Sequence, residues 1–247
     1  MRLAEDFSLD LHRPLPYNSA FTKRKGSTTP MGFFITFEGI EGCGKSTQVR
    51  LAAEHLSHAG YEVVATREPG GCPIADAIRA ILLDARNNAM VPMTELLLYA
   101  AARSQHVAEV IEPALAAGKV VLCDRFTDST LCYQGFGRKL DRELIARLNT
   151  LAAGAIRPDL TLLMDCPVET GLARAMARIN AGNAAREERF EQESLLFHER
   201  IREGFLSLAA AEPARFVVLD GSRGIEETAA LVMKAILPRL PAPQSGS

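Results

Sequence analysis

The chain has 247 residues, of which 47% are hydrophobic and 23% are charged, and its formal net charge at pH 7 is -2. This length can bury a sizeable core as one domain, and a chain without a long Lys/Arg block is poorly suited to a nucleic-acid polymer as its main partner. No stretch approaches the roughly 18 apolar residues of a membrane span. Five scattered cysteines without C-x-x-C spacing fit neither a disulfide framework nor a zinc site, so we expect a soluble cytoplasmic protein with no membrane partner.

Apolar runs predict short strands that alternate with helices. Residues 1–30 mix Pro, Ser, Thr and basic residues with little periodicity, so we expect a disordered N-terminal arm, and a translation start at Met31 is one hypothesis. A domain at 31–237 follows, with predicted strands at 33–37, 61–66, 120–124, 160–165 and 216–219. Predicted helices run from 45 to about 60, at 94–117 with a bend at Pro113, at 141–152, from about 168, to about 211 and at 225–237. A polar segment lies at 180–192, and a flexible tail at 238–247. This alternation predicts an α/β fold, a five-stranded parallel sheet with helices on both faces.

A glycine-rich loop follows the first predicted strand. Residues Gly39 to Ser46, GIEGCGKS, fit the pattern G-x-x-x-x-G-K-[ST]. A strand before the loop and a helix after it direct several backbone N–H groups and the positive helix end toward one point. Lys45 is placed to reach the β- and γ-phosphates of a nucleotide, and the Ser46 hydroxyl to bind Mg²⁺. The loop therefore predicts a nucleotide site.

Charged residues also follow the other predicted strands. Arg67 and Glu68 follow the second strand, Asp124 and Arg125 the third, and Asp165 ends the fourth. Ligands of a parallel sheet bind at the carboxyl ends of its strands, so we expect these residues near the loop. Asp124 is a candidate for holding Mg²⁺ or its water shell. The guanidinium groups of Arg125 and Arg67 are suited to gripping a second phosphate, although a structural pair with a nearby Glu is the alternative for each.

Several short motifs occur in a specific order. They are FEG at 37–39 before the phosphate loop, TREPGG at 66–71, AAR at 101–103, DRF at 124–126, ST at 129–130 and YQG at 133–135. Together they resemble the thymidylate kinase family over about residues 31–237. The resemblance implies a P-loop NTPase-type fold with a small lid at about 178–192, and transfer of the ATP γ-phosphoryl group to dTMP, giving dTDP, with Mg²⁺. It also suggests a homodimer.

The resemblance gives roles to residues outside the loop. Tyr99 would lie near the thymine, with an ordinary core aromatic as the alternative, and Arg103 would contact the base or the acceptor phosphate. Gln134 offers both a donor and an acceptor to a pyrimidine edge, and Tyr133 could crowd the 2′ carbon and favour deoxyribose. Glu41 stands where the family has an acid that faces the acceptor.

A cation common in the phosphate loop is absent from this chain. Some members of the family follow the loop acid with an arginine, but here Gly42 occupies that place. The missing charge is then expected from the lid, and the candidates are Arg174, Arg178, Arg186 and Arg189. We favour Arg178 and Arg189, while a solvated helix surface in which the arginines pair with Glu187, Glu188 and Glu191 is the alternative.

The predicted site can now be written as a whole. Catalysis is expected from Lys45, Arg125, Arg178 and Arg189, and Mg²⁺ binding from Ser46 and Asp124. The ATP-binding residues are Gly39, Ile40, Glu41, Gly42, Cys43, Gly44, Lys45, Ser46, Thr47 and Arg174. The dTMP-binding residues are Glu41, Arg67, Glu68, Pro69, Tyr99, Arg103, Arg125, Ser129, Thr130, Tyr133 and Gln134. The histidines show no metal-ligand constellation and are expected at the surface.

Two other functions fit the phosphate loop. One is a kinase for another nucleoside monophosphate or for a deoxynucleoside, and the second of these would need a base for its uncharged hydroxyl acceptor. The other is a P-loop switch that hydrolyses a nucleotide to control a partner. A phosphate acceptor needs no base, because a monoester with its second pKa near about 6 is largely a dianion at neutral pH.

Overall fold

The computed structural model describes residues 32–181, 189–190 and 193–243. The arm predicted for residues 1–30, much of the predicted lid and the end of the predicted tail lie outside these residues. The strands are β1 (Phe33–Glu38), β2 (Val63–Arg67), β3 (Val120–Asp124), β4 (Leu160–Asp165) and β5 (Phe216–Asp220). The α-helices are α1 (Lys45–His58), α2 (Pro73–Leu83), α3 (Pro92–His106), α4 (Glu112–Ala116), α5 (Thr127–Thr130), α6 (Arg142–Ala153), α7 (Val168–Asn180), α8 (Leu195–Ala211) and α9 (Ile225–Ile236). Short 3-10 or π segments are η1 (Ala85–Asn87), η2 (Val107–Ile111), η3 (Leu131–Gly137) and η4 (Leu237–Arg239).

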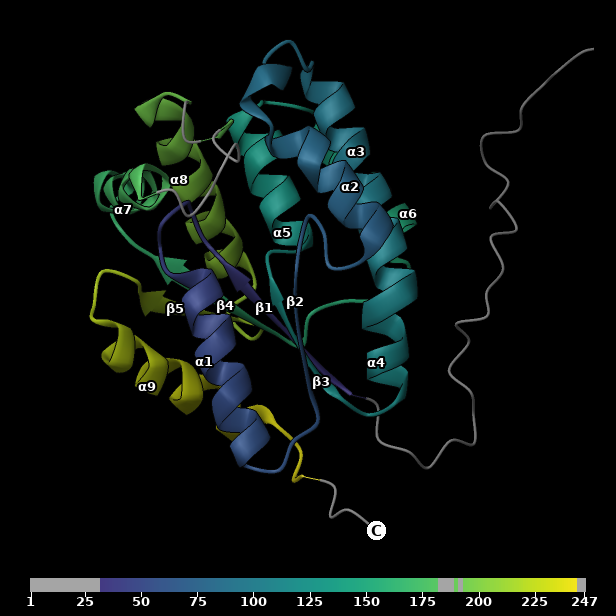
Figure 1. The fold of residues 1–247 in the computed structure, drawn as a ribbon, viewed down its shortest axis with the longest axis vertical. Coiled ribbons are helices and arrows are strands. Elements are labelled where there is room, and N and C mark those ends of the chain that lie inside the picture. The colour runs from purple at the N-terminus through teal and green to yellow at the C-terminus, as the bar shows by residue number, and fades with distance from the viewer. Residues whose placement is uncertain (1–31, 182–188, 191–192, 244–247) are drawn as a thin grey trace, which may run out of the picture. The chain divides into compact units, whose positions relative to one another are not determined.

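The five strands form one parallel sheet in the order β2-β3-β1-β4-β5 (Figure 1). The chain passes from β1 to β2 on one side of the sheet and from β3 to β4 on the other. The loops after the neighbouring strands β1 and β3 therefore leave in opposite directions, which opens a crevice at their carboxyl ends. The register puts Phe37 of β1 beside Asp124 of β3, and Asp124 beside Arg67 of β2. Three strand ends thus meet at this crevice.

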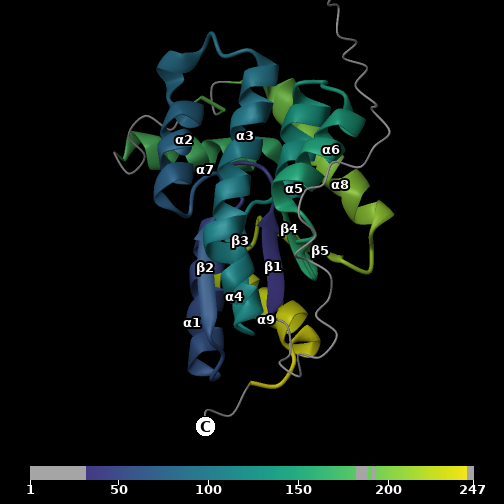
Figure 2. The same ribbon diagram turned by 90° about the vertical axis from the view of Figure 1, so that its right-hand side faces the viewer.

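Helices cover both faces of the sheet, as predicted. Helices α1 and α9 pack side by side on one face, and α4 covers the opposite face, as Figures 1 and 2 show. The alternation of side chains along β1 explains this: Ile35 and Phe37 belong to the core cluster that includes Val49 of α1, whereas Phe34 belongs to a second cluster with Ile111 of η2. A strand buried on both faces is expected to be mainly apolar, and in β1 the residues Phe33, Phe34, Ile35 and Phe37 are apolar. The two polar residues of β1, Thr36 and Glu38, are also buried.

The strands agree closely with the sequence predictions. The third and fourth have the predicted bounds, 120–124 and 160–165. The first and fifth each end one residue later than predicted, and the second begins two residues later and ends one residue later. The first helix begins at Lys45 as expected. Gly60, which follows that helix, has a φ of 88°, in the left-handed region that favours glycine after a helix.

The long helix predicted at 94–117 differs in its interior. It begins at Pro92, and the π segment Val107–Ile111, which the sequence did not predict, interrupts it before Pro113. Proline lacks an N–H, and its ring crowds the carbonyl group four residues earlier, here that of Glu109. The wider π turn relieves that crowding and lets the helix continue.

Two helical stretches were not predicted. Helix α2 starts with Pro73 and leaves Ile74 and Ile81 about half exposed. Its apolar residues therefore do not all lie on one buried face, and the sequence shows no clear helical pattern. The stretch Thr127–Gly137 joins α5 to a π segment that contains two glycines. Periodicity of 3.6 residues is lost in a π turn, and this explains why the sequence pattern did not reveal it.

All five cysteines are buried, and all five are free thiols. Burial raises the pKa values of Cys123 and Cys132 well above that of an ordinary thiol. Among the described helices, none combines the length and the apolar character that crossing a membrane requires.

Candidate active site

A cavity of about 1230 Å³ lies at the crevice. The phosphate loop, the chain after β2 and the chain after β3 all contribute to it. It is lined by these residues of the predicted site: Glu41, Gly42, Cys43, Gly44, Lys45, Ser46, Thr47, Arg67, Glu68, Pro69, Tyr99, Arg103, Asp124, Arg125, Ser129, Thr130, Tyr133, Gln134, Arg174 and Arg178. Gly39 and Ile40 belong to the loop but not to the cavity wall, and Arg189 lies apart from it. The structure therefore gathers most of the predicted residues around one space.

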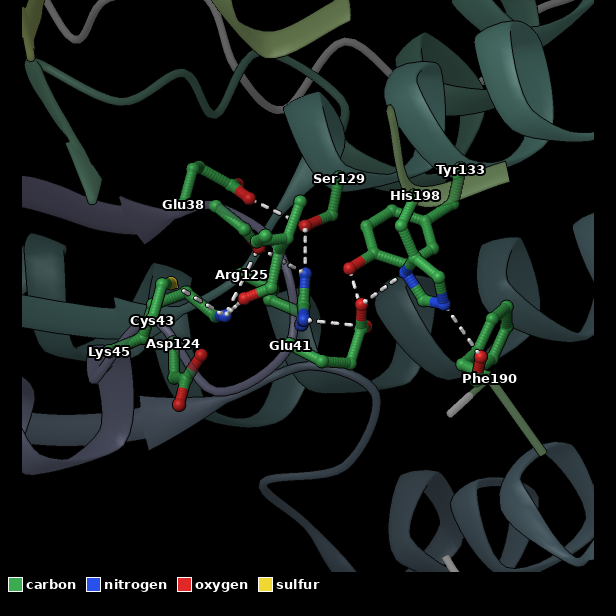
Figure 3. A network of polar contacts seen from close by, with 12 residues as sticks. Glu38, Glu41, Cys43, Lys45, Asp124, Arg125, Ser129, Tyr133, Phe190 and His198 are labelled. Carbon is green, nitrogen blue, oxygen red and sulfur yellow. Dashed lines mark hydrogen bonds and ion pairs between the residues drawn. The ribbon is translucent and has the colours of Figure 1, made fainter. Parts of the chain in front are cut away.

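Lys45 is held at the centre of the phosphate loop. Its Nζ donates to the carbonyl oxygens of Gly39 at 3.1 Å and Ile40 at 2.7 Å (Figure 3). The side chain is buried, and the residue is also the first of α1. Because the unpaired N–H groups at a helix N-terminus carry partial positive charge, the ammonium group and the helix end act on the same point. An anion at this point would meet both.

The phosphate loop sits directly against α7. A Cβ added at Gly42 would lie 1.9 Å from the carbonyl oxygen of Gly171, and one added at Gly171 would lie 2.5 Å from that of Glu41. Such contacts leave no room for any side chain, so the loop has no space for an arginine at position 42. The same contact brings Arg174 and Arg178 of α7 to the cavity wall.

Glu41 lies at the centre of a buried polar network. Its carboxylate accepts hydrogen bonds from Arg125 Nη2 at 3.1 Å and from the Tyr133 hydroxyl, and its Oε2 is 3.2 Å from Nδ1 of His198 (Figure 3). Burial alone would raise the pKa of Glu41, but the ring of His198 and the cations Arg125 and Lys45 more than offset it and lower the pKa to about 2. Glu41 is therefore an anion at neutral pH.

His198 is a member of the site that the sequence did not reveal. The expectation that the histidines lie at the surface holds for His55 and His58 but is wrong for His106 and His198, which are fully buried. The Nε2 atom of His198 is 3.1 Å from the carbonyl oxygen of Phe190. The ring thus joins the phosphate loop to the segment before α8. The residues around His198 in the sequence give no indication that its side chain contacts Glu41.

Arg125 connects the loop after β3 to the loop after β1. Its Nη1 donates to the Gly39 carbonyl at 2.9 Å and to the Ser129 hydroxyl at 3.2 Å. The guanidinium carbon lies 4.8 Å from the centre of the Tyr133 ring. Arg125 itself has a φ of 73°, an uncommon value for a residue with a side chain. Its side chain is largely buried at the cavity wall, where it pairs with Glu41 at 3.1 Å.

A second arginine is fixed deeper in the same cavity. Arg103, which is 2% exposed, donates from Nε to Glu68 at 2.8 Å, from Nη1 to Asn149 at 2.7 Å and from Nη2 to the Thr130 hydroxyl at 2.9 Å. Three partners on three elements set the plane of this guanidinium group. Arg67 differs, because its side chain is 56% exposed and pairs with Asp76 at 3.3 Å.

Ser46 and Asp124 bring two side chains with oxygen atoms into contact at the cavity. The Ser46 hydroxyl donates to the Asp124 carboxylate, and both residues line the cavity. Mg²⁺ prefers oxygen ligands and is commonly held by one or two protein groups together with water and substrate phosphates. The described residues hold no cluster of three or more His, Cys, Asp or Glu that suits a metal ion. This donor set therefore fits Mg²⁺ in a nucleotide complex.

Arg189, predicted to be catalytic, has its guanidinium group elsewhere. Its Nη1 lies 2.6 Å from Oε2 of Glu95 and its Nε donates to the Leu82 carbonyl at 2.6 Å. Arg186 lies outside the described residues, as do residues 182–188 and 191–192 of the predicted lid. Among the described residues, Arg174 and Arg178 of α7 are the candidate lid arginines that line the cavity.

A phosphate loop at the carboxyl edge of a parallel sheet, facing a second cluster of fixed arginines, defines a P-loop phosphotransferase. A family model described as thymidylate kinase matches residues 37–232, most of the chain. The chain belongs to the thymidylate kinase family. It is an enzyme that transfers the γ-phosphoryl group of ATP to dTMP and gives dTDP.

Individual proteins support the same family. The thymidylate kinase of Geobacter sulfurreducens is 75% identical over 211 residues, which cover 85% of this chain and 99% of that protein. The thymidylate kinase of Trichlorobacter lovleyi is 61% identical over 210 residues, with the same two shares. A crystal structure of thymidylate kinase from Ehrlichia chaffeensis is 35% identical, has a TM-score of 0.66, and is matched over 84% of this chain and 99% of that one.

Proposed function

We propose that the enzyme works by holding the phosphates of ATP and dTMP in line between two sets of cations. Lys45 and the amides of the phosphate loop bind the ATP phosphates, and Arg125 and Arg67 bind the phosphate of dTMP. The observation that supports this most directly is the position of Arg125, which shares the cavity with Lys45 and contacts the carbonyl oxygen of Gly39, as Lys45 does. Cations so placed act mainly by positioning and by stabilising charge.

The acceptor needs no general base in this scheme. Its phosphate is already largely ionised at neutral pH, and Glu41, the carboxylate beside Arg125, has its own pKa lowered to about 2. We assign Glu41 to orienting Arg125 and Tyr133 and to facing the acceptor sugar. The thymine ring of dTMP would lie near Tyr99, Arg103, Thr130 and Gln134.

We also propose that Mg²⁺ binds at Ser46 and Asp124. When bound there with ATP, the ion would neutralise phosphate charge. The hydroxyl and carboxylate oxygens that line the cavity side by side support this assignment.

For the lid cations, Arg174 and Arg178 of α7 are the first candidates. Both border the cavity, and Arg174 donates to the carbonyl oxygens of Gly221 at 2.7 Å and Ser222 at 3.0 Å. A role for Arg189 in the transfer would require it to leave Glu95. Arg174 and Arg178 would supply the cation that an arginine at position 42 would otherwise provide.

One assay tests the activity and its rivals together. The purified protein is given ATP and Mg²⁺ with dTMP, dUMP, CMP, GMP, AMP or thymidine, and ADP release and the phosphorylated product are both measured. We expect dTDP from dTMP as the main product. Phosphorylation of another acceptor in preference to dTMP, or ADP release without any acceptor product, would overturn the proposal.

Two further proposals concern the setting of the enzyme. We propose a homodimer formed through a face of α2, α3 and α6, in which α3 packs against both α2 and α6. The exposed apolar side chains at and beside these helices are Ile74, Ile81, Val91, Met93, Leu97 and Leu151. We propose a cytoplasmic location, because five free cysteines suit a reducing compartment.

A further inference from the structure

A buried carboxylate lies behind the proposed base site. Glu95 of α3 is 1% exposed, accepts hydrogen bonds from two side chains and forms an ion pair with a third. Its Oε1 accepts from Gln134 Nε2 at 2.8 Å and from Arg138 Nε at 3.2 Å. Its Oε2 accepts from Arg138 Nη2 at 3.2 Å and lies 2.6 Å from Nη1 of Arg189. Both oxygens are thus committed to donors. A carboxylate that pairs with two guanidinium groups acts as a hydrogen-bond acceptor.

This contact fixes the orientation of the Gln134 amide. Because Glu95 can only accept, the nitrogen of the planar Gln134 amide must face it, and the carbonyl oxygen of the same amide must point away from Glu95. Gln134 is itself a residue of the cavity wall. Within the described residues no group hydrogen-bonds to that Oε1. The wall therefore offers the carbonyl oxygen of Gln134 as a hydrogen-bond acceptor.

We propose that Glu95 is a positioning residue that sets base specificity by holding the Gln134 amide so that its carbonyl oxygen reads ring position 3 of the pyrimidine. Thymine carries an N–H at position 3 and can donate to this oxygen, whereas cytosine has a lone pair there and would face another acceptor. Uracil has the same N–H as thymine and is not rejected by this contact. The inference rests on the proposed role of Gln134 in binding the base.

The test compares kcat/KM for dTMP, dUMP and dCMP in the intact enzyme and in Glu95→Gln. A glutamine at this position can donate as well as accept, so it allows the Gln134 side-chain amide to flip by 180° and present its nitrogen to the pyrimidine. We expect the dTMP to dCMP ratio of kcat/KM to fall at least about tenfold, through KM more than kcat. The dTMP to dUMP ratio should stay unchanged.

A matched control is Glu193→Gln. Glu193 pairs with Arg138, as Glu95 does, but it has no contact with Gln134. This variant removes a carboxylate from the same arginine and should leave the dTMP to dCMP ratio as in the wild type. An equal change in both variants would overturn the proposal, since it would mean that Arg138 and not the amide is responsible.

A double mutant separates positioning from a structural effect. In a Gln134→Ala background, Glu95→Gln should produce no further change in the dTMP to dCMP ratio. If Glu95→Gln does not fold, Gln134→Ala alone decides: it should lose discrimination, and retention of the full ratio would overturn the proposal. Equal loss of activity toward all three substrates in Glu95→Gln would also overturn it. Wild-type activity on dTMP in the same assay reports on the proposed function separately.

Discussion

Lys45 and Arg125 are single residues whose charges the fold has fixed beside the same loop carbonyl. We expect Lys45→Ala and Arg125→Ala each to lower kcat by at least about 100-fold, because each removes a cation from the proposed path of phosphoryl transfer. Both variants should keep the folded state, as judged by circular dichroism. Lys119→Ala and Arg147→Ala remove exposed cations that pair with Glu62 and Glu143, and they should retain full turnover. Near-normal kcat in Lys45→Ala or Arg125→Ala would contradict the roles assigned to them.

The single residue Glu38 is expected to make the free energy of unfolding depend on pH. It is fully buried and accepts hydrogen bonds from the Phe126 N–H at 2.7 Å and the Ser129 hydroxyl at 2.5 Å. Burial, with the nearby charge of Asp128, raises its pKa to about 7. Between about pH 4.5 and 7 the folded protein therefore holds a proton that the unfolded chain has released. The contribution of this group to the free energy of unfolding falls as pH rises through that window.

Glu38→Gln should remove this slope, since an amide does not titrate. Relative to the wild type, the variant should gain on the order of 1–3 kcal/mol in free energy of unfolding between pH 5 and pH 8. Urea denaturation across this range measures the difference, and Glu62→Gln, at a mostly exposed carboxylate, is the control. Glu41 does not disturb the comparison, because its lowered pKa places its titration below this range. Parallel pH profiles for wild type and Glu38→Gln would refute the assignment.

The close contact between the phosphate loop and α7 belongs to the scale of elements. Gly42 and Gly154 both have positive φ, 68° and 58°, but only Gly42 has a neighbour within reach of an added Cβ. Gly154, with a ψ of -126°, has a backbone conformation that residues with a side chain rarely adopt, so Gly154→Ala should cost about 1–3 kcal/mol of stability through backbone strain alone. Gly42→Ala should cost roughly 2 kcal/mol more and raise KM for ATP at least about tenfold, because the loop must move away from Gly171. Thermal unfolding and ATP titrations of both variants measure these effects, and equal behaviour would show that crowding at α7 is unimportant.

The elements differ in how far the sequence could predict them. Strands such as 120–124 and the phosphate loop are encoded by neighbouring residues, and their positions followed from apolar runs and glycine spacing. The π segments escaped because they do not keep the 3.6-residue period. Asp165 was expected at the active edge of the sheet, yet it is held by Arg202 at 2.7 and 2.8 Å and does not line the cavity.

The site shows the same limit more sharply. Residues next to strand ends, such as Arg67 and Asp124, could be placed from topology alone. Glu95 and His198 could not, because their partners Gln134 and Glu41 lie far away in the chain and no local pattern connects them. Buried polar networks depend on tertiary contacts, and a single sequence does not specify which pairs will meet.

At the scale of the whole molecule, the face of α2, α3 and α6 makes the proposed homodimer testable. Leu97 is 50% exposed at this face, where a charge would be buried on association. We expect the wild type to sediment as a dimer and Leu97→Glu to shift toward the monomer by at least about tenfold in dissociation constant. Leu237→Glu changes a similarly exposed leucine on η4 and should leave the dimer intact. A wild type that sediments as a monomer at micromolar concentration would contradict the proposal.

The burial of the cysteines has a practical consequence for the intact molecule. Cys72, Cys123, Cys132 and Cys166 are at most 5% exposed and lie outside the cavity wall, so an alkylating reagent can reach them only when the chain opens. Iodoacetamide labelling followed by peptide mass spectrometry should thus report opening at four separate places without any engineered probe. Rapid modification of these sulfurs under native conditions would show that the core exchanges with open forms far more often than its packing implies.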